Sequence, residues 1–397
     1  MPIRVGNKAD GDDFFDRTAE REDLWRYLAG NHVVLSGARR LGKTSLLQRV
    51  AEEAAERGWQ ARLLDVEGID SAEAFVDQLA RAFDEATLSG GRRSVGAAVT
   101  RVFASLRKVD VRVPGGAGVG LELQALAETP WRKAALALQE RVSGQTQLFL
   151  IDEFSVFLDK LLARDALDGE RLLGWLRAWR QQAGLACRFV FSGSIGLNAL
   201  LARHHLSTRF NDCADFRLGP FKPAAALAML AELAQREQWP VAADSLEHLC
   251  RRVGWLSPFY LNLLLDGSLQ AARERLEEDR TAQRLLTTDD IDAAYDRLLA
   301  NRSRFFHWFQ RLARELQEPQ LSFTLALLAA VARAENGLSR RQLAARLTRH
   351  EPNPDRRAER LDEALLLLEE DGYLDAGETI HFPSFLLRDY WRRNHGR

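Results

Sequence analysis

The sequence predicts an α/β protein that begins with a parallel five-stranded sheet and continues with helical segments. Two observations support this prediction. Short apolar runs alternate with amphipathic helical stretches from residue 1 to about residue 218, a pattern typical of a parallel sheet with crossover helices. From residue 220 to about residue 316 the strand pattern stops, and the sequence has helical periodicity only.

Five segments of the first part have the composition expected of strands that are buried on both faces. Each is short and rich in Val, Leu, Ile and Phe. Amphipathic stretches such as 44–57 and 172–182 lie between them, and we expect these to be helices. The expected strands are residues 32–37, 61–66, 147–152, 187–193 and 215–219.

The composition excludes several classes of protein. The 397 residues include 55 Lys and Arg against 56 Asp and Glu, a formal net charge of −1, which excludes nucleic-acid binding through bulk positive charge. The N-terminus has no apolar signal segment, and the apolar run 321–332 is too short to cross a bilayer. Three cysteines without metal-ligand spacing fit a reducing compartment. We therefore expect a cytoplasmic protein of two or three domains without membrane contact.

The most specific motif is a glycine-rich loop that follows the first expected strand and opens a helix. It matches the pattern G-x-x-x-x-G-K-[ST] and is followed by Ser45. Backbone N–H groups of such a loop, together with the helix N-terminus, bind phosphate oxygens. Lys43 is expected to reach the β- and γ-phosphates, and the Thr44 hydroxyl to ligate Mg²⁺. The loop, which predicts binding of a nucleoside triphosphate, consists of Gly37, Ala38, Arg39, Arg40, Leu41, Gly42, Lys43 and Thr44.

A second motif, LFLIDEF, places two acids at the end of a buried strand. Asp152 is positioned to hold Mg²⁺ through water, and Glu153 is suited to polarise an attacking water molecule. An acid at a strand end is often only a helix cap, but its combination with the phosphate loop favours the functional interpretation. The pair therefore predicts hydrolysis of the bound nucleotide.

These motifs together resemble those of AAA+ ATPases, and more narrowly the archaeal-type ATPases of the STAND class, relatives of the origin-recognition initiators. The resemblance covers nearly the whole chain, and the phosphate loop is its one specific motif. It implies an α/β nucleotide-binding domain over residues 1–218, a helical lid over 219–318 and a winged helix over 319–397. The segments that carry it are FFDRTAEREDLWRYL, GARRLGKTSLL, the SGS after the fourth strand, VGWLSPFYL and FPSFLLRDYW.

The resemblance also implies roles for residues outside the two motifs. Phe15, Asp16 and Arg17 would begin the segment that packs near the adenine. Ser192 or Ser194 would stand at the sensor-1 position, which contacts the γ-phosphate or water and which is often Asn in AAA+ proteins. The alternative is that a serine after a buried strand is only a turn residue.

Two further features of the resemblance concern an arginine and the lid. Arg209, with Arg203 as its competitor, would be an arginine finger presented to a neighbouring subunit. Gly254, Ser257 and Pro258 resemble a stretched form of the G-x-P lid motif. The alternatives are a solvated surface arginine and a proline that only starts a helix.

Two segments are candidates for contact with DNA. Residues 92–113 carry six basic side chains against the single acid Asp110, a local charge of +5. The expected recognition helix of the winged helix begins with Arg356, Arg357 and Arg360, although residues 320–397 contain 12 Arg and 12 acids. The alternatives are a solvated helix face for the first segment and a docking site for a protein for the second.

The sequence therefore predicts a slow, Mg²⁺-dependent ATPase that acts as a switch and couples ATP to self-association or to a protein partner. The rival hypothesis is a DNA-binding or scaffold protein whose ATP is structural and barely hydrolysed. A plain P-loop kinase is disfavoured by the acid pair and by the C-terminal segment. No G-x-S-x-G elbow and no C-x-x-C pair is present to suggest another chemistry.

Overall fold

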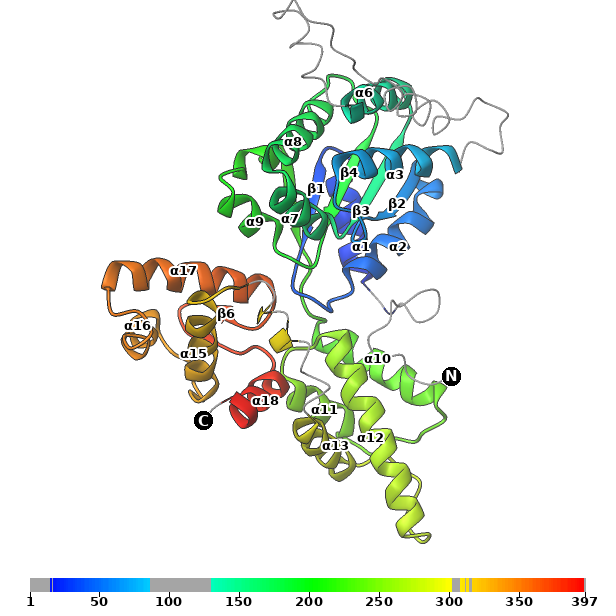
Figure 1. The fold of residues 1–397 in the computed structure, drawn as a ribbon. Helices are drawn as coiled ribbons and strands as arrows, with labels where there is room; N and C mark the ends of the chain where they lie inside the picture. Colours follow the sequence, from blue (N-terminus) through cyan, green and yellow to red (C-terminus); the bar gives the residue numbers. More distant parts are fainter. Residues whose placement is uncertain are drawn as a thin grey trace, which may run out of the picture. The chain divides into compact units, whose positions relative to one another are not determined.

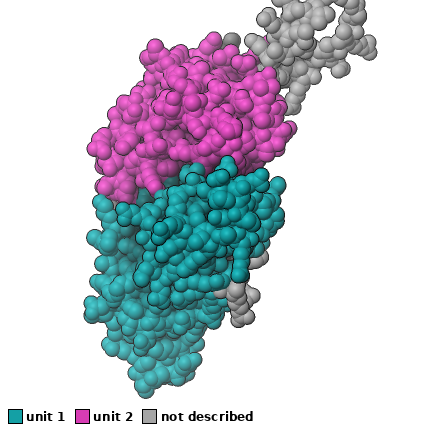
Figure 2. All heavy atoms as spheres, turned by 90° about the vertical axis from the view of Figure 1, so that its left-hand side faces the viewer, with its two compact units in different colours: residues 1–16, 37–42, 218–397 teal, residues 17–36, 43–217 magenta. Residues whose placement is uncertain are grey.

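The computed structural model describes residues 15, 17–85, 130–301, 308–310, 312–313 and 316–395. The chain forms two compact units, which Figure 2 shows in different colours. We call residues 17–36 and 43–217 the sheet unit, and residues 1–16, 37–42 and 218–397 the helical unit. The division falls inside the phosphate-loop motif, because the sheet unit resumes at Lys43.

The sheet unit contains a five-stranded parallel sheet with the strand order β2-β3-β4-β1-β5 (Figure 1). This confirms the predicted fold class. All six residues of β3 are buried, as expected for a central strand. The strands are β1 (His32–Ser36), β2 (Gln60–Asp65), β3 (Gln147–Asp152), β4 (Arg188–Ser192) and β5 (Cys213–Arg217).

The expectation that every strand is buried on both faces is wrong for β2 and β5. These strands lie at the two edges of the sheet, where alternate residues face solvent. In β2 the side chains of Gln60, Leu63 and Asp65 are exposed. The order in which the strands pair therefore determines how much of each strand is buried.

Helices pack against the sheet through a core rich in aromatic side chains. Phe149 of β3 stacks on Phe189 of β4 with ring centroids 5.0 Å apart, and Trp179 packs edge-on against Phe189. The predicted helix 172–182 begins earlier than expected, because the side chain of Asp165 accepts a hydrogen bond from the Asp168 N–H and caps it. The α-helices are α1 (Thr18–Leu28), α2 (Lys43–Glu53), α3 (Ala72–Glu85), α6 (Pro130–Val142), α7 (Phe154–Arg164), α8 (Ala166–Arg180) and α9 (Leu197–Arg203).

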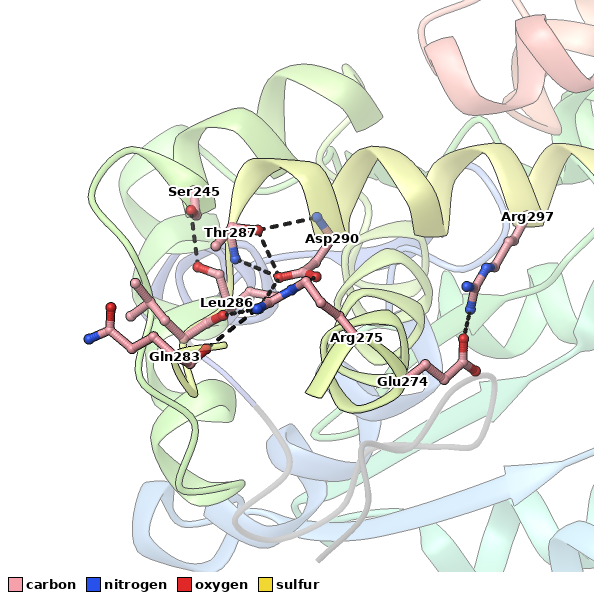
Figure 3. A network of polar contacts seen from close by, with 9 residues as sticks. Ser245, Glu274, Arg275, Gln283, Leu286, Thr287, Asp290 and Arg297 are labelled. Carbon is pink, nitrogen blue, oxygen red and sulfur yellow. Dashed lines mark hydrogen bonds and ion pairs between the residues drawn. The ribbon is translucent and has the colours of Figure 1, made fainter. Parts of the chain in front are cut away.

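The first part of the helical unit is a group of four helices, α10 (Pro223–Arg236), α11 (Ser245–Val253), α12 (Pro258–Glu278) and α13 (Thr288–Ala300). A capping box starts α13, since the Thr287 hydroxyl and the Asp290 carboxylate each bond the backbone N–H of the other residue. Arg275 of α12 donates two hydrogen bonds to the same carboxylate, at 2.8 and 3.0 Å, as Figure 3 shows. One buried carboxylate thus fixes the angle between two helices.

The rest of the helical unit contains helices and a pair of short strands. Three helices precede an antiparallel pair of short strands, and α18 closes the chain. One apolar cluster extends from α10 to α18. The elements are α15 (Gln320–Ala332), α16 (Arg340–Arg346), α17 (Pro354–Glu370), β6 (Asp375–Ala376), β7 (Ile380–His381) and α18 (Phe385–His395).

The basic segment 92–113, predicted as a candidate for contact with DNA, falls outside the described residues. Within the described ranges, no helix has both the length and the apolar character needed to cross a membrane.

Candidate nucleotide site

The phosphate-loop motif has the local structure that its glycines predict. Gly37 and Gly42 have φ angles of 137° and 90°, a region that L side chains rarely adopt. A Cβ at Gly37 would lie 2.5 Å from the carbonyl oxygen of Leu218, so only glycine fits there. Lys43 then begins α2, and the backbone N–H groups in the first turn of a helix are suited to bind phosphate oxygens.

Asp152, the first acid of the LFLIDEF motif and the candidate Walker B aspartate, contacts two hydroxyl groups from different elements. Asp152 ends β3 and is buried. The Thr44 hydroxyl donates to one of its carboxylate oxygens at 2.5 Å, and the Ser192 hydroxyl, at the end of β4, donates to the other at 2.6 Å. The three residues follow or end neighbouring parallel strands, whose carboxyl ends lie at one edge of the sheet.

Glu153 is held in an unusual backbone conformation directly after this aspartate. Its φ of 57° is left-handed, which costs a residue with a Cβ roughly 1 kcal/mol or more. Its carboxylate accepts a hydrogen bond from the backbone N–H of Ser194 at 2.8 Å. Ser194 therefore positions Glu153 through its backbone N–H, and Ser192 is the serine whose hydroxyl contacts Asp152.

Ser155 is a residue of this region that the sequence analysis missed. Its side chain is buried, and its hydroxyl has no hydrogen-bond partner in the described chain. A Cβ at Gly193 would lie 2.0 Å from this hydroxyl oxygen, so the loop after β4 passes close to it only because residue 193 is glycine. The S-G-S sequence of that loop indicates a close approach at the glycine, but it does not show that the neighbouring element is α7 with Ser155.

Inside the helical unit, residues 38–40 of the phosphate loop contact two other segments. The Ser257 hydroxyl, at the start of α12, donates to the Arg40 carbonyl at 2.9 Å, and the Arg40 guanidinium lies 3.6 Å from the Phe259 ring centroid. Burial lowers the pKa of Arg40 from its usual value. A Cβ at Gly372 would lie 2.5 Å from the Ala38 Cβ.

Pro258 occupies the first turn of α12. Its neighbour Ser257 makes the contact with the phosphate loop. Arg17, predicted near the adenine, is buried in the sheet unit and forms an ion pair with Glu20 at 2.8 Å. Phe15 packs against the apolar cluster of the helical unit, and Asp16 lies outside the described residues.

The structure places the two finger candidates differently. Arg209 lies in a short 3₁₀ helix, η4 (Ser207–Phe210), just before β5. The amino end of β5 pairs with the amino end of β1, so Arg209 lies towards the sheet edge opposite the one where the phosphate loop begins. Arg203 ends α9 and lies 3.9 Å from a carboxylate oxygen of Asp159. Neither arginine therefore joins the Asp152 cluster.

The donor set of the Asp152 cluster fits Mg²⁺. A threonine hydroxyl and a carboxylate lie side by side, and Mg²⁺ is usually held by one or two carboxylates with waters and substrate phosphates. Among the described residues, no group of three His, Cys, Asp or Glu side chains is arranged to hold a metal by itself. Phosphate oxygens would therefore complete such a site.

No family model matches the chain, and no curated protein matches it. Solved structures do. The chain is similar to a Walker-type ATPase of Pyrococcus abyssi, with 18% identity and a TM-score of 0.63 over 99% of this chain and 100% of that one. It is also similar to the ORC2 protein of Aeropyrum pernix, solved as ADPNP-ADP complexes, with 16% identity and a TM-score of 0.51 over 96% of each chain. The chain thus has the fold of an archaeal Walker-type ATPase and of an origin-recognition protein.

Proposed function

We propose that this chain binds ATP with Mg²⁺ and hydrolyses it slowly, as a switch that couples nucleotide state to assembly or to a partner. The observation that carries the proposal is the cluster of Thr44, Asp152 and Ser192, in which the phosphate-loop threonine directly contacts the Walker B aspartate. A glycine-rich loop whose only role was to start a helix would not require a contact between Thr44 and Asp152. The predicted three-domain organisation belongs to the proposal, with a lid and a winged helix after residue 218, and so does a cytoplasmic location.

Each residue of the proposed site has one task. The loop from Gly37 to Ser45 and the amine of Lys43 bind and orient the phosphates, while Arg17 and Pro258 are proposed to lie near the nucleotide. Thr44 and Asp152 hold Mg²⁺, which when bound neutralises charge on the phosphates. Glu153, aligned by the Ser194 N–H, orients the attacking water and accepts its proton.

Two variants test this assignment. Lys43→Ala is expected to weaken ATP binding, because the lysine contacts phosphates in the ground state. Glu153→Gln is expected to preserve binding and to stop turnover, because the carboxylate acts on the water only during hydrolysis. Binding of a fluorescent ATP analogue and release of phosphate measure the two effects separately. An equal loss of nucleotide affinity in both variants would contradict the roles of Lys43 and Glu153.

DNA is a second candidate partner, favoured by the local charge of +5 over residues 92–113. The arginines at the start of α17 are less suited to it, because Arg360 pairs with Glu351 at 2.8 Å and Arg357 donates to the Glu351 carbonyl at 2.7 Å. Only Arg356 of that group has no side-chain partner in the described chain.

A salt series distinguishes the two basic segments. If residues 92–113 bind DNA, affinity depends on counterion release and falls steeply with salt. Charge reversal of Arg107, Lys108 and Arg112 is then expected to abolish binding and to leave ATP affinity unchanged. Reversal of Arg356, Arg357 and Arg360 is the comparison variant. If the wild-type protein binds no DNA at low salt in either nucleotide state, the DNA hypothesis is wrong and the partner is a protein.

A further inference from the structure

We propose that the groove between α6 and α8 of the sheet unit binds the acidic face of α17 from a second copy of this chain. The proposal rests on the self-association included in the proposed function, and it names the two surfaces that meet. We define the α6/α8 groove by Arg132, Leu136 and Gln139 of α6 and by Leu167, Arg171, Gly174 and Ala178 of α8.

The α6/α8 groove exposes apolar surface. It has a volume of about 470 Å³ and is lined by Leu136 and Leu167, whose side chains are 52% and 57% exposed. These two are the most exposed large hydrophobic residues in the described chain. Single exposed leucines are common on protein surfaces. Two exposed leucines that line the same groove form a larger apolar surface, which is typical of an interaction site.

The same groove carries positive charge without partners. Neither Arg132 nor Arg171 makes a side-chain hydrogen bond or ion pair with the described chain. Arg209 lies at the groove as well, with one guanidinium nitrogen 3.8 Å from where a Cβ at Gly174 would be. Glu170 is the single acid among the lining residues. The groove therefore favours an apolar segment that also carries carboxylates.

The shape of the groove suits a helix. The α8 residues that line it recur at helical spacing, and Gly174 and Ala178 are small enough to let a second helix approach. Side-chain hydrogen bonds from Trp131 to Asp168 at 2.8 Å and from Trp175 to Gln139 at 3.2 Å tie α6 to α8. The groove is thus a preformed surface.

This chain itself carries the matching helix face. On α17, Asp355, Glu359, Asp362, Glu363 and Leu366 are exposed along one side, and Leu366 is 44% exposed. The carboxylate of Glu359 has no side-chain partner in the described chain, whereas Asp362 pairs with Arg340 and Glu363 accepts a bond from Gln320 at 3.0 Å. Arg356 and the Arg340 paired with Asp362 are the cations beside this face, which carries four acids and an exposed leucine towards the C-terminal end of α17.

We assign a second copy as the occupant because the α6/α8 groove and the exposed face of α17 have opposite charges and both expose leucine. Because the two surfaces differ, the contact between them is heterologous, and repetition of it yields rings or longer assemblies. It also brings a neighbouring copy onto the surface that carries Arg209, the arginine proposed to act in trans.

Charge swapping tests the contact. The groove variant Arg132→Glu/Arg171→Glu and the helix variant Glu359→Arg/Glu363→Arg are each expected to associate on the order of 100-fold more weakly than the wild type, because like charges then face each other. A mixture of the two variants is expected to recover association. Each contact between the two different variants joins opposite charges, either in the natural or in the swapped sense. Sedimentation velocity, with and without ATP, measures the mass.

The matched controls change the net charge by the same amount at positions outside the two proposed surfaces. Lys133→Glu/Arg141→Glu lies on α6 outside the groove, and Glu277→Arg/Glu278→Arg lies at the end of α12, so both are expected to associate as the wild type does. A wild type that stays monomeric in every nucleotide state overturns the proposal. So does a groove variant that associates normally, or a mixture of folded variants that stays monomeric. ATP binding is measured separately, so a chain that binds no nucleotide contradicts the proposed function and leaves this test intact.

Discussion

His32 is a buried side chain that the structure keeps neutral. Its two ring nitrogens contact the backbone, one the Arg180 carbonyl oxygen at 3.1 Å and the other the Phe189 N–H at 3.2 Å. The second nitrogen accepts this bond, so a proton there would face a donor. Burial lowers the pKa of His32 to about 4. The hydrogen bond to the Arg180 carbonyl and the charge of Asp212 oppose this effect, whereas the charges of Arg180 and Arg188 add to it.

A pH dependence of stability follows from this residue. In the unfolded chain His32 has a pKa of about 6.5, so between about pH 6.5 and about pH 4 only the unfolded state takes up the proton. The stabilisation is complete above about pH 6.5 and decreases by about 3 kcal/mol as the pH falls through that window. Urea unfolding across this range measures it. His32→Gln is expected to have a flatter profile, and an unchanged profile would contradict this role.

At the scale of elements, the angle between α12 and α13 depends on Asp290. Its carboxylate is 3% exposed and accepts bonds from Arg275 and from the Thr287 hydroxyl and N–H (Figure 3). Burial alone would raise the pKa of Asp290, but these hydrogen bonds offset that effect and the pKa lies below its usual value. The stabilisation is therefore present above about pH 4 and is lost as the pH falls further.

Asp290→Ala is expected to destabilise the helical unit by about 2–3 kcal/mol, because it removes a helix cap and leaves Arg275 without its partner. Chemical denaturation measures the loss. Glu274→Ala is the matched control, since Glu274 lies next to Arg275 and pairs with Arg297 on the surface. Its unfolding midpoint is expected to stay unchanged. Equal midpoints for the two variants would show that the Asp290 network does not stabilise this pair of helices.

At the scale of the whole molecule, the position of Arg209 bears on assembly. Arg209 precedes the amino end of β5, whereas the phosphate loop follows the carboxyl end of the neighbouring parallel strand β1. An arginine finger at this position would therefore serve the site of another copy. Assembly would then be a condition for efficient turnover.

Arg209→Ala is expected to bind ATP normally and to hydrolyse it on the order of 10³-fold more slowly once assembled. Mixing it with the Glu153→Gln variant is expected to restore part of the activity, because some contacts then join an intact site to an intact arginine. Phosphate release by the single variants and by their mixture measures this. Unchanged turnover in Arg209→Ala would remove this arginine from the site, and Arg203 would be the next to test.

The fold class and the motif residues could be predicted from the amino-acid sequence. Short apolar runs at regular intervals specify buried strands, and β1, β3 and β4 lie within two residues of their predicted bounds. A loop that must turn tightly and present N–H groups needs glycine at fixed positions. The roles of Gly37 and Gly42 in the loop can therefore be recognised from the sequence, and both have positive φ angles. The roles of Lys43 and Glu153 in turnover remain predictions.

The contacts between residues far apart in the sequence could be seen only in the tertiary structure. Ser257 contacts Arg40 although 217 residues separate them, and no local pattern encodes such a pair. The same is true of the edge position of β2, the approach of Gly193 to Ser155 and the α6/α8 groove. Periodicity reports which side chains an element can bury, whereas long-range packing decides which of them are covered and which partners they find.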